Sequence, residues 1–371
     1  MKYYIIAGEP SADLHGANLI KGIIKNDPNA EIRFWGGELM QIEAGDKGTL
    51  VKHYKENSIM GFVEVVKNIG KILGLMKFCK KDMLEFAPDV LILIDYPGFN
   101  LKMAGFAKKN GIKTAYYIAP KVWAWKKGRI KTIRKVVDDL YVIFPFEVKF
   151  FEEHGIKAIY KGNPIMDSIE ESRANYTKIE SERPIIALVA GSRVQEVKHI
   201  LPVMADAMKL MPEYQGVVTA VEWLDKTLYE EILKDTDIQI IYNKTPDILL
   251  SAEAALVKSG TATLEAALLK VPEVVCYAGG RISVAIGRIV LKINWISLVN
   301  IILNRTAVTE LIQQDLTAEN CVKQLKLIMP DGANSEKLKI EYDDLQQLVG
   351  ASGASERVAE DIITRLKNNN I

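Results

Sequence analysis

The stretch Ala254-Ala-Leu-Val-Lys-Ser-Gly-Thr-Ala-Thr-Leu-Glu-Ala-Ala-Leu268 indicates how the second half of the chain folds. Its apolar start predicts a buried strand, and the residues from Leu264 onward predict a helix. The turn between them holds only small or hydroxylated residues, so no bulky side chain blocks a ligand. Because a helix N-terminus exposes unpaired N–H groups and about half a positive charge, this turn suits a phosphate. An ordinary turn capped by Thr261 or Thr263 is the alternative.

The totals of the chain describe a folded protein with more than one domain. At 371 residues it exceeds the usual size of a single hydrophobic core, so two domains are expected. Hydrophobic residues make up 49% and charged residues 26%, which excludes a disordered or fibrous protein. The three cysteines and four histidines are scattered, which argues against a disulfide framework and a clustered metal site. Met1 leads directly into an apolar strand without a signal region, so we expect a cytoplasmic protein.

Charge is unevenly distributed along the chain, although the net charge is only +1. Residues 1–165 hold 26 lysines and arginines against 18 acidic residues, a net charge of +8, and the remainder carries −7. This asymmetry predicts that only the first half faces an anionic partner. A nucleic acid and an anionic membrane fit the charge equally well.

The N-terminal residues have the order of a β–loop–α unit. Tyr3 to Ala7 predict a strand, Gly8-Glu-Pro-Ser-Ala-Asp13 a loop, and Leu14 to Ile24 a helix. This opening fits a doubly wound α/β domain. No G-x-G-x-x-G motif follows the strand, which counts against a dinucleotide-binding fold of the NAD type.

A second buried strand carries the clearest candidate for a catalytic group. Val90 to Ile94 form an unbroken apolar run, which ends in Asp95-Tyr-Pro-Gly-Phe-Asn100. Ligands of open α/β sheets bind outside the carboxyl ends of the strands, so Asp95 lies where a catalytic carboxylate is expected. The alternative is a turn-forming aspartate before Pro-Gly.

Two basic segments of the first half suit an anionic surface. Residues 59–83 combine apolar residues at helical spacing with five lysines, too many charges for a membrane-spanning helix. They fit a helix lying in a membrane interface, or a surface helix packed on its own sheet. Residues 121–135 hold seven cations and no acid, together with Trp123 and Trp125. This segment fits a phosphate with a ring, a nucleic acid or lipid headgroups, or else a solvated helix with two packed indoles.

The second half repeats the β–loop–α order after a charged linker at 170–183. Residues 184–189 predict a strand, Ala190-Gly-Ser-Arg193 its loop, and Glu196 the start of a helix. The guanidinium of Arg193 has the geometry to clamp a pyrophosphate, unless it is an ordinary surface arginine. Asp235-Thr-Asp237 matches the D-x-D pattern of metal-dependent sugar transferases, but it precedes a strand, at the wrong end for a ligand. A polar turn is the expected reading.

Together, these loops resemble the lipid-A-disaccharide synthase family. The matching segments follow the family's order across residues 4–315, which covers most of the chain. They are Gly8–Asp13 with Gly16-Ala17, Asp95–Asn100, Pro120–Trp125, Pro145–Glu147, Gly162–Pro164 with Asp167, Gly191–Arg193 with Glu196, Ser259–Glu265, and Asn300 followed by Glu310 and Gln313.

The resemblance implies the B-type glycosyltransferase fold, with two Rossmann-like α/β domains and an active-site cleft between them. Residues 1–168 would bind the acceptor and face the membrane, and residues 184–350 would bind the UDP-sugar. The C-terminal helix, 355–371, would pack back on the first domain or be exchanged in a homodimer.

The resemblance also implies a reaction. The 2,3-diacylglucosamine unit of UDP-2,3-diacylglucosamine moves with inversion to the 6-hydroxyl of 2,3-diacylglucosamine 1-phosphate (lipid X). The products are the β-1,6 disaccharide and UDP. No metal, cofactor or nucleic acid is implied. Both substrates are acylated, which implies work at the cytoplasmic face of the inner membrane, with the basic first half as the docking surface.

Residue roles follow from the same resemblance. Asp95 is the implied catalytic base, and Gly98, where many members have a second acid, leaves that role to Asp95 alone. Alanine at position 12, where many members have glycine, puts the acceptor contacts of the first loop in question. The implied donor-side residues are Gly191, Ser192, Arg193, Ser259, Gly260, Thr261, Thr263, Glu265, Asn300, Glu310 and Gln313. The implied acceptor-side residues are Gly8, Glu9, Ser11, Asp13, Asn100, Trp123 and Trp125.

Two other functions remain open on the sequence. One is a different UDP-sugar transferase or epimerase of the same architecture. That reading keeps the UDP loop but leaves the Asp95–Asn100 segment without a role. The other is a membrane-surface protein that binds a UDP-sugar without turning it over.

Overall fold

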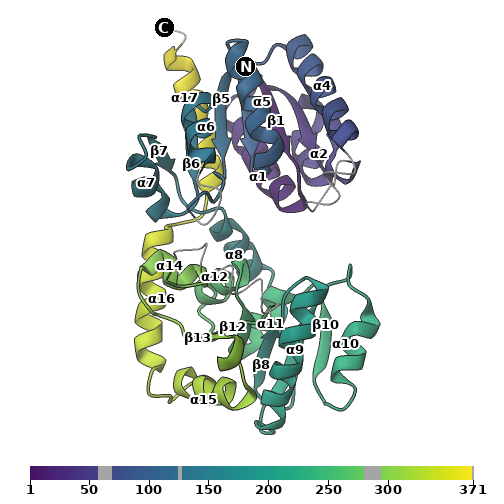
Figure 1. The fold of residues 1–371 in the computed structure, drawn as a ribbon, viewed down its shortest axis with the longest axis vertical. Helices are drawn as coiled ribbons and strands as arrows, with labels where there is room; N and C mark the ends of the chain where they lie inside the picture. The colour runs from purple at the N-terminus through teal and green to yellow at the C-terminus, as the bar shows by residue number, and fades with distance from the viewer. Residues whose placement is uncertain (57–68, 124–127, 280–293, 370–371) are drawn as a thin grey trace. The chain divides into compact units, whose positions relative to one another are not determined.

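The structure, a computed structural model, describes residues 1–56, 69–123, 128–279 and 294–369. The chain divides into two compact units, Met1–Pro164 with Ser352–Ile371, and Ile165–Ala351. Each unit is built on a parallel sheet covered by helices (Figure 1). Two α/β units with parallel sheets are the fold class that the sequence predicted.

The sheet of the first unit has seven strands in the order β3-β2-β1-β4-β5-β6-β7, and all neighbours are parallel. Its strands are β1 (Lys2–Ala7), β2 (Glu31–Gly36), β3 (Gly48–His53), β4 (Val90–Ile94), β5 (Lys113–Tyr117), β6 (Asp139–Val142) and β7 (Ala158–Tyr160). Its helices are α1 (Pro10–Asn26), α2 (Glu38–Ala44), α4 (Ile69–Phe86), α5 (Pro97–Lys109), α6 (Arg129–Val136), α7 (Pro145–Glu152) and α17 (Ala354–Asn369).

Strand β1 shows why this sheet is buried on both faces. Alternate side chains of a strand point to opposite faces. Tyr3 and Ile5 therefore pack with α1 and α17, whereas Tyr4 and Ile6 pack with α4, α5 and α6. The apolar residues of β1 thus belong to two hydrophobic cores, one on each face of the sheet.

The sheet of the second unit has six parallel strands in the order β10-β9-β8-β11-β12-β13. Its strands are β8 (Ile185–Val189), β9 (Gln215–Ala220), β10 (Gln239–Tyr242), β11 (Ala252–Lys258), β12 (Glu273–Tyr277) and β13 (Glu310–Ile312). Its helices are α8 (Ile165–Ala174), α9 (Val194–Lys209), α10 (Lys226–Leu233), α11 (Thr245–Ser251), α12 (Thr261–Leu268), α14 (Leu298–Leu303), α15 (Ala318–Ile328) and α16 (Ser335–Val349).

The strand order of each sheet reverses at one point, between β1 and β4 in the first and between β8 and β11 in the second. The loops at the carboxyl ends of the strands diverge on either side of such a point and leave a crevice for a ligand. Each unit therefore has one position where its topology favours a ligand site.

The C-terminal helix α17 belongs to the first unit (Figure 1), where it packs on α1. Gly22 permits the close approach, because a Cβ at this position would lie 2.9 Å from Glu356 Cα and 3.0 Å from Ala359 Cβ. The hydroxyl of Tyr141 donates a hydrogen bond to Asp361 (2.9 Å). The helix thus packs back on the first unit; exchange with a second chain stays a prediction.

Several elements begin or end away from their expected positions. Helix α1 begins at Pro10, so four of the six residues of the expected loop 8–13 are helical, as the preference of proline for the first helical turn permits. The division between the units follows Pro164, not residue 168. Helix α8 extends into the expected linker 170–183 and belongs to the second unit. Residues 59–68 lie outside the described part of the chain. Within the described residues, no helix is both long and apolar enough to cross a bilayer.

Candidate functional site

The loops at the switch point of the second sheet form a pocket of about 370 Å³. It lies at the carboxyl ends of β8 and β11, where the Arg193 loop and the hydroxyl-rich turn begin. The predicted donor-side residues that line it are Gly191, Ser192, Arg193, Gly260, Thr261 and Glu265. The structure thus brings most of the predicted donor-side residues together.

The first turn of α12 forms one wall of this pocket. Thr261 is exposed there, and the first N–H groups of a helix have no partner within it. Ser259 and Thr263 are buried, and their hydroxyls donate to the carbonyls of Ile296 and Gly260, both at 2.8 Å. These two hydroxyls shape the turn instead of facing a ligand, so the wall offers an anion its backbone N–H groups and Thr261.

The loop after β8 and the first turn of α9 form the opposite wall and carry two charged groups, Arg193 and Glu196. The carboxylate of Glu196 accepts a hydrogen bond from the Ser192 N–H (3.1 Å) and lies 3.7 Å from the Arg193 guanidinium. It also pairs with Lys258 at the end of β11 (2.8 Å). Gly191 has a φ of 105°, and a Cβ there would lie 2.5 Å from Glu196 Oε2, so glycine is required for two reasons. The sequence did not predict that Lys258 lines this pocket, although its position directly before Ser259-Gly-Thr261 is a signal that could have indicated it.

Glu265 lines the same pocket one turn into α12. Burial raises the pKa of its carboxyl above the ordinary value. A partly buried carboxyl at this position can accept hydrogen bonds from hydroxyls, as a ribose presents them. Contact with the ribose stays a prediction.

The other predicted donor-side residues stabilise the segment that leads into β13. Glu310 accepts hydrogen bonds from the backbone N–H groups of Ile296 and Ser297 and from the Asn300 side chain. Asn300 is fully buried, and both of its amide atoms bond to the chain, including the carbonyl of Val308 (2.9 Å). The Gln313 side chain donates to the carbonyl of Gly279 (3.0 Å). All three fix a loop here, and direct contact with a donor stays untested.

In the first unit, Asp95 follows β4 at the switch point, in a strained turn. Asp95 and Tyr96 both have left-handed backbones, with φ of 45° and 46°. Such angles cost free energy and persist where surrounding contacts impose them. The Asp95 carbonyl accepts a hydrogen bond from the Tyr116 hydroxyl (2.6 Å) and one from the Asn100 amide (2.8 Å). Asn100 is fully buried, so it positions this turn from behind.

Charged groups around Asp95 determine its protonation. Burial raises the pKa of the Asp95 carboxyl, and the positive charges of Lys121 and Arg129 oppose this rise. The pKa of Glu9, in the loop after β1, is raised by its burial and by the charge of Asp95. Lys121 and Arg129, which follow β5, therefore act electrostatically on Asp95, and Asp95 acts on Glu9. The sequence predicts Lys121 and Arg129 only as members of a basic segment.

The remaining residues of the first loop support this site. A Cβ at Gly8 would lie 2.5 Å from the Tyr96 ring, so glycine lets that ring pack over the loop. Asp13 is buried, and its carboxylate accepts hydrogen bonds from the backbone N–H groups at the start of α2, among them Gly37 (2.6 Å). Asp13 therefore caps α2 instead of presenting its carboxylate to an acceptor. Ser11 is exposed.

Trp123 is half-buried in the first unit. Its indole N–H donates to Glu147 (2.9 Å), and its ring meets the edge of Phe146 at 5.1 Å. Glu147 is buried and also accepts hydrogen bonds from the backbone N–H groups of Ile143 and Phe144. Burial raises the pKa of Glu147 to about 7. Trp125 lies outside the described residues.

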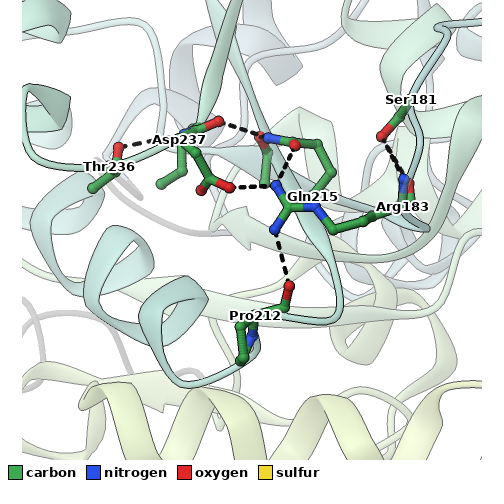
Figure 2. Close-up of polar contacts among 8 residues, drawn as sticks. Ser181, Arg183, Pro212, Gln215, Thr236 and Asp237 are labelled. Atoms are coloured by element: carbon green, nitrogen blue, oxygen red, sulfur yellow. Dashed lines mark hydrogen bonds and ion pairs between the residues drawn. The ribbon is translucent and has the colours of Figure 1, made fainter.

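Asp237 of the D-x-D sequence belongs to a polar cluster shown in Figure 2. The guanidinium of Arg183 pairs with the Asp237 carboxylate and donates to the Pro212 carbonyl (2.9 Å) and the Gln215 side chain (2.5 Å). Arg183 and Asp237 precede β8 and β10, so the cluster lies at the amino ends of the strands. No group of three or more potential metal ligands occurs within the described residues.

Two comparisons of the sequence agree with each other. A family model described as lipid-A-disaccharide synthetase matches residues 3–362. The lipid-A-disaccharide synthase of Syntrophus aciditrophicus is 36% identical, with 98% of this chain and 97% of that protein covered. The enzyme of that name from Anaeromyxobacter dehalogenans (strain 2CP-C) is 35% identical, with 97% and 96% covered.

Solved structures with similar folds bind or transfer sugars, but their sequences are distant. UDP-GlcNAc 2-epimerase from Neisseria meningitidis, bound to UDP-GlcNAc, has a TM-score of 0.67 and 12% identity over 98% of this chain and 100% of its own. The calicheamicin glycosyltransferase CalG4 has a TM-score of 0.63 and 12% identity over 99% and 98%. At such identities only the fold is shown, and it confirms the predicted two-domain architecture. The family model and the relatives confirm the predicted family as well: this chain belongs to the lipid-A-disaccharide synthetase family, whose members are glycosyltransferases.

Proposed function

We propose that this chain transfers 2,3-diacylglucosamine from UDP-2,3-diacylglucosamine to the 6-hydroxyl of lipid X, with inversion at the anomeric carbon. Family membership supports the reaction. The observation that carries the chemistry is the strained Asp95 turn at the switch point of the first sheet, whose carboxyl is subject to the positive charges of Lys121 and Arg129. A carboxylate at such a point is suited to act as a general base on a substrate hydroxyl.

The proposed step forms one bond and breaks another. Asp95 accepts the proton of the acceptor 6-hydroxyl while the oxygen of that hydroxyl bonds to the anomeric carbon of the donor. The bond between that carbon and the diphosphate oxygen breaks, and UDP leaves with the electron pair. Arg193 and the N-terminus of α12 stabilise the negative charge of the departing diphosphate. No divalent metal takes part in the step as proposed.

Incubation with both substrates tests the proposal. The expected result is disaccharide 1-phosphate and UDP in equal amounts, in buffer that contains a chelator. Release of UDP without disaccharide, or conversion of the donor into an isomeric UDP-sugar, would contradict it. Binding of UDP without any turnover would favour the non-catalytic alternative.

The proposal includes peripheral attachment to the cytoplasmic face of the inner membrane. Helix α4 supports it, because three large apolar side chains on its surface, Leu73, Phe78 and Leu84, are 47–57% exposed. Exposed lysines 71, 77 and 81 lie among them. Such a surface favours an anionic bilayer.

A homodimer with exchanged C-terminal segments is a further part of the proposal. Helix α17 follows two glycines with left-handed backbones, Gly350 (φ 83°) and Gly353 (φ 81°). The backbone conformations of these two glycines allow the chain direction to change before α17. The contacts between α1 and α17 would then form between two chains.

A further inference from the structure

Lys258 lies at the carboxyl end of β11, inside the pocket that the proposed function assigns to the donor. Its side chain is 19% exposed, whereas that of Arg193, the cation predicted from the sequence, is 82% exposed. The lysine ammonium therefore has a defined position before any ligand arrives. A group that is already ordered loses less conformational entropy on binding.

The ammonium group of Lys258 lies beside the positive end of a helix. It is 3.7 Å from the position that a Cβ on Gly260 would take, directly before the first turn of α12. Two positive features repel one another unless a negative charge lies near them. Glu196 provides that charge, because its Oε1 lies 2.8 Å from the lysine nitrogen.

The Glu196 carboxylate connects both walls of the pocket. Its Oε1 pairs with Lys258, and its Oε2 accepts the N–H of Ser192 (3.1 Å). An ammonium group has three donors, and within the described residues Glu196 is the partner that the structure shows for Lys258. Donors remain for an anion in the pocket.

We propose that Lys258 is a phosphate-binding residue of the donor site and that Glu196 is the positioning residue that holds it ready. The ligand is a nucleoside diphosphate, so the inference rests on the proposed function and adds to it a second cation for the diphosphate. Lys258 would bind a phosphate oxygen without leaving Glu196, while the exposed Arg193 closes on the ligand from the other wall.

Binding of UDP and of uridine, measured by calorimetry, tests this role. Lys258→Met should weaken UDP binding about 10- to 100-fold, the usual effect of losing a hydrogen bond to a charged group, and leave uridine binding unchanged. Lys258→Arg should keep most of the UDP affinity. Lys198→Met is the matched control, since it removes the same charge from an exposed position of α9; its UDP affinity should equal that of the parent.

A double variant separates phosphate binding from a purely structural role. If Lys258 only neutralises Glu196, Lys258→Met with Glu196→Gln will recover the parent affinity for UDP, and the inference is overturned. If Lys258 binds phosphate, the double variant will stay weak for UDP and normal for uridine. Equal UDP binding by Lys258→Met and the parent also overturns the inference and leaves the proposed function intact. A parent protein that binds no UDP overturns the proposed function itself.

Discussion

Asp95 owes its position to two side chains that bind its backbone carbonyl. The left-handed angles at Asp95 and Tyr96 are unfavourable for residues other than glycine, so the Tyr116 and Asn100 hydrogen bonds must stabilise them. Tyr116 is buried in β5 and Asn100 in α5, so the turn is held by rigid elements. A carboxylate held in this way has one defined direction for accepting a proton.

Tyr116→Phe tests this positioning. The change removes one hydrogen bond and keeps the ring, so a loss of about 1 kcal/mol in the free energy of unfolding is expected. Turnover should fall about tenfold, because a small displacement of the base is costly in the transition state, while UDP affinity stays at the parent value. Turnover and calorimetry measure both quantities. Parent-like turnover with the same loss of stability would show that the hydroxyl only stabilises the fold.

Glu273 is a buried carboxyl that predicts a pH dependence of stability. It is 1% exposed, and neither carboxylate oxygen has a hydrogen-bond partner within the described residues. Burial, and then the charge of Glu310, raise its pKa well above the ordinary 4.5. As pH rises above 4.5, the Glu273 carboxyl ionises in the unfolded chain before it ionises in the folded protein. The free energy of unfolding therefore falls until the pH passes the folded pKa of Glu273.

Glu273→Gln should remove this fall. Between pH 5 and the folded pKa of Glu273, the free energy of unfolding of the variant should rise relative to that of the parent by up to about 1.4 kcal/mol per pH unit. Denaturant titrations at several pH values measure it, with the exposed Glu231→Gln as control. Parallel stability curves for parent and Glu273→Gln would contradict the burial of this carboxyl.

At the scale of single residues, the sequence predicted which residues follow the carboxyl ends of strands better than it predicted the partners of polar groups. Asp95, Arg193 and Thr261 were predicted because each follows a buried strand, where parallel sheets bind ligands. Thr263 and Asn300 were expected to face the donor, but they satisfy backbone groups of their own loops. Spacing along a chain does not show which donor or acceptor a hydroxyl or amide meets after folding.

At the scale of elements, the contact between α1 and α17 depends on the missing side chain of Gly22. Gly22→Ala would place a Cβ 2.9 Å from the backbone of Glu356, which cannot move as a flexible side chain can. We expect a loss of about 1–3 kcal/mol in the free energy of unfolding, the usual cost of overpacking. Gly70→Ala is the control, since α4 leaves open space there. Equal stability of the two variants would contradict the close packing of α17.

Helix α4 carries the prediction of membrane binding. Its inner side packs through Met76, Cys79 and Met83, so its exposed lysines can be changed without disturbing the core. Lys77→Glu with Lys81→Glu should weaken cosedimentation with vesicles of anionic phospholipid about tenfold or more, at about 1 kcal/mol per cation near the surface. High salt should release the parent in the same way.

The control for this prediction is a pair of lysines in the second unit, Lys198→Glu with Lys209→Glu. Both are exposed on α9, and the pair changes the net charge by the same amount. Equal binding by both double variants would show that α4 is not the docking surface.

Strands and helices were predicted well where periodicity was strong, and less well at their ends. Val90–Ile94 matches β4, because a strand that is buried on both faces of a parallel sheet needs an unbroken run of apolar residues. The start of α12 lies at Thr261, three residues before the expected Leu264, because Thr263 donates hydrogen bonds to the carbonyl of Gly260 from its N–H (3.3 Å) and its hydroxyl (2.8 Å). Helix ends depend on such local hydrogen bonds more than on hydrophobic spacing.

At the scale of the whole molecule, local patterns predicted two units, whereas only the family resemblance implied that the C-terminal helix packs back on the first unit or is exchanged between chains. The repeated β–loop–α order and the change of charge both point to a division near the middle of the chain. Helix α17 joins the first unit through packing with α1, a contact between residues more than 300 positions apart. Local patterns carry little information about such long-range contacts.

A cysteine pair tests whether α17 is exchanged between chains. Lys25 and Glu356 pair at 2.5 Å across α1 and α17, so Lys25→Cys with Glu356→Cys places two thiols on the facing sides of these helices. The native cysteines are buried. The proposed exchange predicts a covalent dimer after oxidation, seen by non-reducing electrophoresis, and either single variant alone should stay monomeric under the same conditions. A covalently closed monomer from the double variant would contradict exchange.

The role of Asp95 as the base is the central claim, and Asp95→Asn measures it most directly. The amide keeps the size of the side chain and cannot accept the acceptor proton, so turnover of UDP-2,3-diacylglucosamine with lipid X should fall about 10²- to 10⁴-fold. UDP affinity should stay at the parent value, because UDP is assigned to the pocket around Arg193. Asp46→Asn, at an exposed position, should leave turnover unchanged. Turnover by Asp95→Asn at the parent rate would contradict the proposed mechanism.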